Sequence, residues 1–231
     1  MLVYGKNVVL EYLNKNKNIK NAYIQDNFKD LEILGKIKKK NINIKYLSRY
    51  DMDKKINGVH QGVIIDVDDY KYYKLDDIIS GDNLIVMLDH IEDPHNFGAI
   101  IRTCEAAGVD GIIIPDNRSI DVNSTVIKTS VGTTENVKIV KVTNLVNTIK
   151  KLKENGYWIF GTDMQGDDYK TLDYRGKTCI ICGNEGKGMS KLVKDNCDFI
   201  ASIRMNGTVN SLNASVATAI ILFEAMYKRI N

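Results

Sequence analysis

Residues 84–108 read LIVMLDHIEDPHNFGAIIRTCEAAG, and this stretch decides the fold class of the chain. Its first five residues are apolar without a break, which is typical of a parallel strand buried on both faces. Polar residues follow, and a helix expected over about residues 96–107 ends at Gly108, a residue that suits a helix C-terminus. The order of strand, polar loop and helix predicts an α/β fold in which ligands bind at the carboxyl ends of parallel strands.

The same alternation of strands and helices continues to the end of the chain. It predicts a mostly parallel sheet for a C-terminal domain of residues 81–231. Residues 1–68 form a smaller α/β domain by the same criteria, and residues 69–80, rich in Asp, Tyr and Lys, form a linker. The expected strands are 22–24, 42–47, 62–67, 84–88, 111–114, 138–142, 157–161, 178–182 and 199–203, and the expected helices are 3–13, 31–40, 96–107, 124–130, 145–155 and 212–230.

Positive charge is concentrated at the front of the chain. Residues 1–66 carry 13 Lys and Arg against 7 Asp and Glu, a net charge of +6, whereas residues 67–231 carry 19 against 22. A basic N-terminal domain favours a polyanionic partner such as a nucleic acid, with a solvated lysine-rich surface as the alternative.

Several classes of protein are disfavoured by the composition. No run of 18 apolar residues exists among the 231, so a membrane span is not expected, and residues 1–10 lack the pattern of a signal peptide. A cytoplasmic protein is therefore expected. Cys179 and Cys182 have CxxC spacing but fall in a predicted buried strand, which favours core cysteines over a metal site or a disulfide.

Two later segments combine glycines and polar residues after predicted strands. Residues 183–190, GNEGKGMS, form a loop that can approach a flat ligand closely, with Glu185 as a candidate functional carboxylate. The spacing matches neither a P-loop nor GxGxxG, which disfavours a dinucleotide-binding oxidoreductase. Residues 203–217, IRMNGTVNSLNASVA, lead into the last helix, whose N-terminus favours polar or anionic ligand groups.

Together these segments resemble the SpoU-type, or TrmH-family, RNA ribose 2′-O-methyltransferases of the SPOUT class. The motifs of that family look like residues 93–102, 183–188 and 203–213, in the same order. Residues 3–11 and 60–63 resemble the L30e-like RNA-binding domain of RlmB-like members. The resemblance implies a SPOUT-type C-terminal domain with a trefoil knot, and a homodimer built through that domain.

The resemblance also implies the cofactor, S-adenosylmethionine, and the residues around it. Gly183, Ile203, Met205 and Leu212 would bind the cofactor, and no metal is needed for methyl transfer. The implied reactive residues are Asn96, Arg102, Glu185, Ser211 and Asn213. In the family Arg102 would activate the ribose hydroxyl, but an arginine hardly ever loses its proton in a protein. Its guanidinium could instead hold an RNA phosphate in a bidentate manner.

RlmB-like members methylate a guanosine ribose in large-subunit rRNA, so the resemblance implies that substrate. The same chemistry on tRNA is one alternative, and a noncatalytic RNA-binding or ribosome-assembly protein is another. On its own, the segment of residues 88–105 is also compatible with a capped surface helix in which Arg102 pairs with Glu105. His90 and His95 flank the expected site. His95 is a candidate base by residue type, but the resemblance gives it no such part, and we assign it a positioning or structural role.

Overall fold

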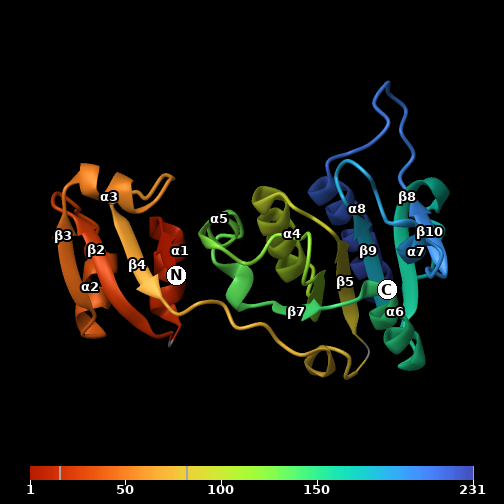
Figure 1. Ribbon diagram of the computed structural model, residues 1–231, viewed down its shortest axis with the longest axis horizontal. Coiled ribbons are helices and arrows are strands. Elements are labelled where there is room, and N and C mark those ends of the chain that lie inside the picture. Colours follow the sequence, from red (N-terminus) through yellow and green to blue (C-terminus); the bar gives the residue numbers. More distant parts are fainter. Residues whose placement is uncertain (16, 82, 231) are drawn as a thin grey trace. The chain divides into compact units, whose positions relative to one another are not determined.

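The computed structural model describes residues 1–15, 17–81 and 83–230, and its strands form two separate sheets (Figure 1). The contacts between Cα atoms divide the chain into two units. The N-terminal unit comprises Met1–Lys71 and Val122–Gly132, and the C-terminal unit comprises Tyr72–Asp121 and Thr133–Asn231. Both units combine helices with a sheet, so the predicted α/β class is confirmed.

The N-terminal unit has a mixed sheet in the order β1-β4-β2-β3. Strand β4 pairs antiparallel with β1 and β2, whereas β2 and β3 are parallel. The first strand differs from the sequence prediction, which extends the first helix back to residue 3. Gly5 separates the two elements, because its φ of 94° is open to glycine and turns the chain at once from strand into helix. The strands are β1 Leu2–Tyr4, β2 Ile19–Gln25, β3 Asn43–Leu47 and β4 Val63–Val67.

Helices cover this sheet and bury its apolar side chains. Helices α1 and α2 pack against each other, and α3 packs against β2. The sequence does not predict α3, because its seven residues bury only Met52 and therefore have no apolar period. Its start is fixed instead by Ser48, whose side chain accepts a hydrogen bond from the Asp51 backbone N–H at 3.2 Å. The helices are α1 Lys6–Asn14, α2 Leu31–Lys39, α3 Arg49–Lys55 and α5 Ser124–Thr129.

Helix α5 comes from the middle of the sequence but belongs to the N-terminal unit. It contacts β1, and Asn123 caps its N-terminus by accepting hydrogen bonds from Thr125 and Val126. The sequence division assigns residues 122–132 to the C-terminal domain, because nothing in a local pattern shows which distant strand a short helix will contact. The domain bounds 1–68, 69–80 and 81–231 otherwise stay a prediction.

The C-terminal unit has a sheet in the order β10-β8-β9-β5-β6-β7, and all its neighbouring strands are parallel. This confirms the mostly parallel sheet. Every residue of β5 is buried, as its unbroken apolar run predicts. Cys179 and Cys182 are buried in β9 with free thiols. The strands are β5 Leu84–Asp89, β6 Gly111–Pro115, β7 Lys138–Val142, β8 Trp158–Asp168, β9 Thr178–Gly183 and β10 Phe199–Ser202.

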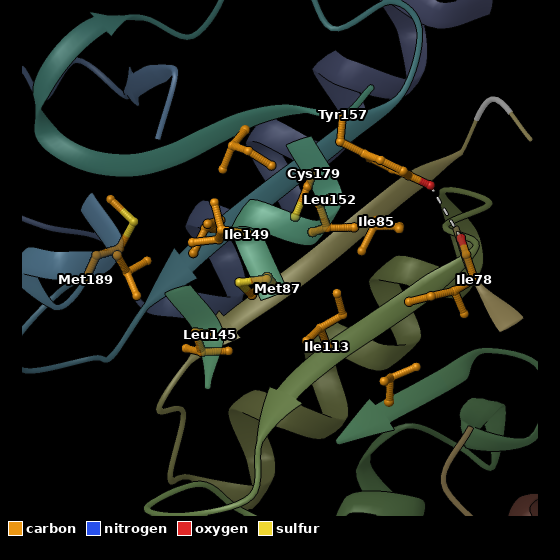
Figure 2. Close-up of a cluster of buried hydrophobic side chains, with 14 residues drawn as sticks. Ile78, Ile85, Met87, Ile113, Leu145, Ile149, Leu152, Tyr157, Cys179 and Met189 are labelled. Atoms are coloured by element: carbon orange, nitrogen blue, oxygen red, sulfur yellow. Dashed lines mark hydrogen bonds between the residues drawn. The ribbon is translucent and has the colours of Figure 1, made fainter. Parts of the chain in front are cut away.

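Helices and the central strands of this unit enclose a continuous apolar core (Figure 2). Ile85 and Cys179 come from neighbouring strands, and Ile149 and Leu152 come from a helix that packs on them. At one end of the core the Tyr157 hydroxyl donates to the carbonyl oxygen of Ile78 at 3.5 Å. The core fixes the strand ends that carry the candidate site. The helices are α4 Pro94–Ala106, α6 Leu145–Glu154, α7 Lys191–Lys194 and α8 Ala214–Ile230.

Across the part of the chain that the structure describes, no helix is both long and apolar enough to span a membrane. The trefoil knot stays an expectation from the resemblance.

Candidate functional site

The three segments singled out in the sequence follow the carboxyl ends of strands in one parallel sheet. The first follows β5, the second follows β9 and the third follows β10. Strands β5 and β9 are neighbours, and their last residues, Asp89 and Gly183, lie opposite each other. Loops that leave parallel strands at the same edge converge there, which is the usual place for ligands in such sheets.

Three side chains from these segments form a hydrogen-bonded chain. The Asn96 amide Nδ2 donates to Oε1 of Glu185 at 2.9 Å, and Nδ2 of Asn213 donates to Oδ1 of Asn96 at 2.8 Å. Asn96 is thus held at both ends of its amide, which fixes the direction in which it points. The structure therefore joins three of the five expected reactive residues, although as many as 117 residues separate Asn96 from Asn213 in the sequence.

The N-terminal turns of α4 and α8 hold Asn96 and Asn213 where their side chains can form this hydrogen-bonded chain. Asp93 caps α4 by accepting hydrogen bonds from the backbone N–H groups of His95 and Asn96, at 2.6 and 3.1 Å. Asn96 consequently lies in the first turn and its side chain remains available for Glu185. Asn213 accepts from the Ser215 backbone N–H at 2.9 Å at the start of α8, so its oxygen serves the helix and its amide nitrogen serves Asn96.

The glycine loop after β9 is folded tightly on itself. The backbones of Asn184 and Gly188 exchange two hydrogen bonds, at 3.1 and 2.9 Å, and Oδ1 of Asn184 accepts from Gly186 and Lys187. A Cβ atom added to Gly183 would lie 2.3 Å from the backbone carbon of Gly188. Only glycine allows two backbone segments to approach this closely, so the shape of the loop requires a glycine at position 183.

Asp89 and His90 tie this loop to the end of β5. Asp89 is only 1% exposed, and its Oδ2 accepts from the Ser190 backbone N–H at 2.6 Å. Its other oxygen is 2.5 Å from Nδ1 of His90, and the His90 carbonyl oxygen accepts from Nδ2 of Asn184 at 2.7 Å. The loop is thereby anchored at Asn184 and at Ser190. Asp89 is not among the site residues expected from the sequence, although a carboxylate at the end of an apolar strand is a signal for such a role.

A cavity of about 310 Å³ opens beside the glycine loop. Residues from the second and third segments line it, together with Thr162 of β8 and with Thr218 and Ile221 of α8. Cys182 is part of the wall, and burial raises the pKa of its thiol to about 11, so the thiol is neutral at physiological pH. All four residues expected to bind the cofactor contribute to this lining, as do two of the expected reactive residues: Gly183, Ile203, Met205, Leu212, Glu185 and Ser211.

The residues that line the 310 Å³ cavity suit a small ligand that has both apolar and hydrogen-bonding groups. The lining includes the apolar side chains of Met205 and Leu212 and residues of the glycine loop. Pockets of a few hundred Å³ with this character are typical of small-molecule and cofactor sites. A second cavity, of about 710 Å³, adjoins it and shares Ile203 and Met205 in its lining. Within the described residues no group of three or more His, Cys, Asp and Glu side chains could hold a metal ion.

Arg102 stands apart from the hydrogen-bonded chain. It is exposed on α4, six residues beyond Asn96 and hence about 9 Å further along the helix axis. It has no hydrogen bond or ion pair with any described residue, and the pairing with Glu105 weighed above is not formed. Glu105 instead accepts from Nδ2 of Asn136 at 3.1 Å. The guanidinium is therefore available to a molecule that is not part of this chain.

The histidines have distinct positions. His90 is a left-handed residue with a φ of 61° and serves the loop anchor described above. His95 is exposed in the first turn of α4. His60 has a structural role in the N-terminal unit, where Nδ1 accepts from the Gly62 backbone at 2.9 Å and Nε2 is 3.0 Å from Asp53.

Comparison with known proteins relates both units to RNA-modifying enzymes. Residues 83–223 match the model of the SpoU rRNA Methylase family, and residues 2–73 match that of RNA 2′-O ribose methyltransferase substrate binding. YacO of Bacillus subtilis, assigned to the TrmH family of tRNA/rRNA methyltransferases, is 38% identical over 98% of this chain and 95% of its own length. A Staphylococcus saprophyticus protein assigned to the same family is 40% identical, over 99% of this chain and 96% of its own.

Solved structures agree with these sequence matches. The SpoU methyltransferase AviRb from Streptomyces viridochromogenes, crystallised with AdoMet, superimposes with a TM-score of 0.85 and is 25% identical, covering 100% of this chain and 90% of that one. An AdoMet-bound rRNA methyltransferase from Sinorhizobium meliloti gives a TM-score of 0.82 at 26% identity, covering 97% and 85%.

Proposed function

This chain belongs to the SpoU rRNA methylase family, and we propose that it transfers a methyl group from S-adenosylmethionine to a ribose 2′-hydroxyl of RNA. The observation that carries the proposal is the hydrogen-bonded chain of Asn96, Glu185 and Asn213, one member of which lines the 310 Å³ cavity. Polar groups fixed beside a ligand-sized cavity are what an alignment-controlled transfer needs.

The cofactor fits the cavity residues. Gly183, Ile203, Met205 and Leu212 would hold it, because all four line the cavity and combine the backbone of the glycine loop with apolar side chains. Bound there, it supplies an activated methyl group. Methyl transfer requires no redox-active group from the chain. The neutral Cys182 thiol forms part of the cavity wall.

Each reactive residue has a task that suits its side chain. Asn96, held by Glu185 and Asn213, orients the ribose. Arg102 holds a phosphate of the RNA with its guanidinium and stabilises negative charge on the attacking oxygen. Ser211, in the cavity lining, hydrogen-bonds the ligand. Among these five residues Glu185 alone carries a carboxylate, so it takes the 2′-hydroxyl proton directly or through a water molecule.

The Glu185→Gln variant separates this task from simple positioning. The amide oxygen of Gln can still accept the hydrogen bond from Asn96, but the side chain cannot accept a proton. We expect kcat to fall by about 10²- to 10⁴-fold, with unchanged affinity for S-adenosylmethionine in calorimetry. Glu154→Gln, at the exposed end of α6, is the matched control. A Glu185→Gln enzyme with nearly full kcat would restrict Glu185 to orienting Asn96.

Large-subunit rRNA is the proposed substrate, with a guanosine as the modified nucleotide. Support comes from the N-terminal match to a substrate-binding model and from the +6 charge of residues 1–66, which suits a folded RNA. The cytoplasm is the corresponding place of action. No specific observation favours a noncatalytic role.

A transfer assay tests both the chemistry and the substrate. Radiolabelled S-adenosylmethionine is offered with unmodified large-subunit rRNA and with bulk tRNA, and the label is mapped to a nucleotide and to its ribose. A single 2′-O-methylguanosine in rRNA is the expected product. Label in tRNA would retain the activity and change the substrate, and the absence of cofactor binding would overturn the proposal.

A homodimer through the C-terminal unit is part of the proposal. One side of helix α8 is buried in its own unit, but another side exposes large apolar side chains. The exposed fractions are 46% for Val216, 42% for Phe223 and 74% for Ile230. Such a row favours burial against a second copy. We expect twice the chain mass in light scattering and a monomer for Phe223→Glu. A wild-type monomer at assay concentrations would contradict the dimer.

A further inference from the structure

Lysine ammonium groups lie over two tyrosine rings at one edge of the N-terminal sheet. The Nζ atoms of Lys45 and Lys55 are 5.9 and 4.3 Å from the ring centroid of Tyr23. The Nζ of Lys54 is 4.2 Å from the ring centroid of Tyr50. These five residues, from β2, β3 and α3, are called the lysine–tyrosine patch below.

The positive charge of this patch is not neutralised within the chain. No carboxylate among the described residues lies within salt-bridge distance of Lys45, Lys54 or Lys55. Asp53, on the same helix, is engaged by His60 and Arg49, at 3.0 and 3.8 Å. Four other lysines of the unit have carboxylate partners: Lys6 with Asp30, Lys15 with Glu11, Lys20 with Asp68 and Lys36 with Glu32.

The patch is exposed and yet anchored to the fold. Tyr50 is 67% exposed, and the three lysines are exposed as well. Below them Met52 is fully buried in a cluster with Ile64, and Tyr23 packs against that cluster. The rings and ammonium groups are therefore presented on a fixed surface, which reduces the ordering entropy lost when a ligand binds.

Exposed aromatic rings beside unpaired cations suit one class of ligand. Unpaired RNA nucleotides offer bases that stack on aromatic rings and phosphates that attract lysine, whereas a duplex hides its bases and offers phosphates alone. A base that stacks on Tyr50 displaces Lys54 from one ring face, and the freed ammonium can pair with the adjoining phosphate.

We propose that the lysine–tyrosine patch binds a single-stranded segment of the RNA substrate, away from the nucleotide that is methylated. This inference rests on the proposed function, since it assigns a contact surface for the same RNA. Part of the affinity for the RNA substrate would then come from β3 and α3 of the N-terminal unit, through the ring of Tyr50 and the three lysine charges.

The test uses the full chain and a short fluorescent oligouridylate, with an RNA duplex of equal length as comparison. Fluorescence anisotropy should show that Tyr50→Ala weakens single-strand binding about tenfold, as expected for a lost stacking contact. Tyr50→Phe keeps the ring and should retain the affinity. Tyr46→Ala is the matched control, because Tyr46 is 57% exposed but follows Lys45 in the strand and so faces the opposite side of the sheet.

Charge is tested separately from stacking. Replacing Lys45, Lys54 and Lys55 together with Gln should lower the slope of log affinity against log salt by about two. The same replacement of Lys29, Lys38 and Lys39, exposed lysines elsewhere in the unit, should have a smaller effect. Equal losses for both triple variants, or unchanged affinity for Tyr50→Ala, would overturn the proposal.

Methyl transfer distinguishes this inference from the proposed function. In the Tyr50→Ala variant the KM for RNA should rise about tenfold, while kcat at saturating RNA and the thermal unfolding midpoint stay as in the wild type. If no RNA is methylated by the wild type but the patch variants still lose oligouridylate binding, the function fails and the patch stands. If transfer occurs with an unchanged KM in Tyr50→Ala, the patch fails and the function stands.

Discussion

Replacing Arg102 with Ala is expected to lower kcat/KM for RNA by about 10³-fold, because the guanidinium would supply two charge-assisted hydrogen bonds in the transition state. The fold should not change, since Arg102 is exposed and has no hydrogen bond or ion pair with the described residues. Cofactor affinity should also be unchanged, because Arg102 does not line the 310 Å³ cavity. Single-turnover transfer and calorimetry with S-adenosylmethionine measure the two effects separately.

The Arg102→Lys variant decides how the charge is used. Lysine keeps the charge but cannot donate two parallel hydrogen bonds, so the loss should remain at about 10²-fold if binding is bidentate. Arg175→Ala is the control, because Arg175 is an exposed arginine of the same unit whose partner is Asp173, at 2.7 Å. Near-full turnover of Arg102→Lys would contradict the bidentate role, and loss of cofactor binding in Arg102→Ala would show that it acts on the cavity.

The strands and long helices follow from local sequence patterns. The apolar run of β5 predicts a fully buried strand, and that is observed. Elements without a strong period are missed: β1 has three residues and α3 buries one side chain. The position of α5 in the N-terminal unit depends on contacts with β1, far away in the sequence, which no local pattern encodes.

In the candidate site, too, some features can be predicted from the sequence and others require the tertiary structure. The resemblance names Asn96, Glu185 and Asn213 one by one, but the hydrogen bonds that join them require the tertiary structure. The anchoring of the glycine loop by Asp89 is also a tertiary feature, formed with Ser190 over 101 residues. Arg102 shows the reverse case, because its task depends on a molecule outside the chain, and the folded chain leaves it without a partner.

Replacing Gly183 with Ala is expected to weaken S-adenosylmethionine binding more than 100-fold and to reduce transfer accordingly. The added Cβ would meet the backbone carbon of Gly188 and the backbone nitrogen of Met189, both at 2.3 Å. Backbone atoms cannot rotate away as a side chain can, so the whole loop must move. Movement there also disturbs the pairing of Gly183 with Asp89 and changes the cavity wall.

Gly186→Ala makes the effect specific to that close approach. It adds the same methyl group three residues later in the same loop, where the new Cβ would meet only Oδ1 of Asn184, at an ordinary 3.7 Å. Calorimetry should therefore give Gly186→Ala an affinity within a few-fold of the wild type. Equal losses in both variants would mean that the loop rejects any side chain. The added methyl group must displace the glycine loop, and a displaced loop cannot keep its original contacts with the cofactor. Wild-type affinity in Gly183→Ala would therefore show that the cofactor binds without this loop geometry, which would contradict the prediction.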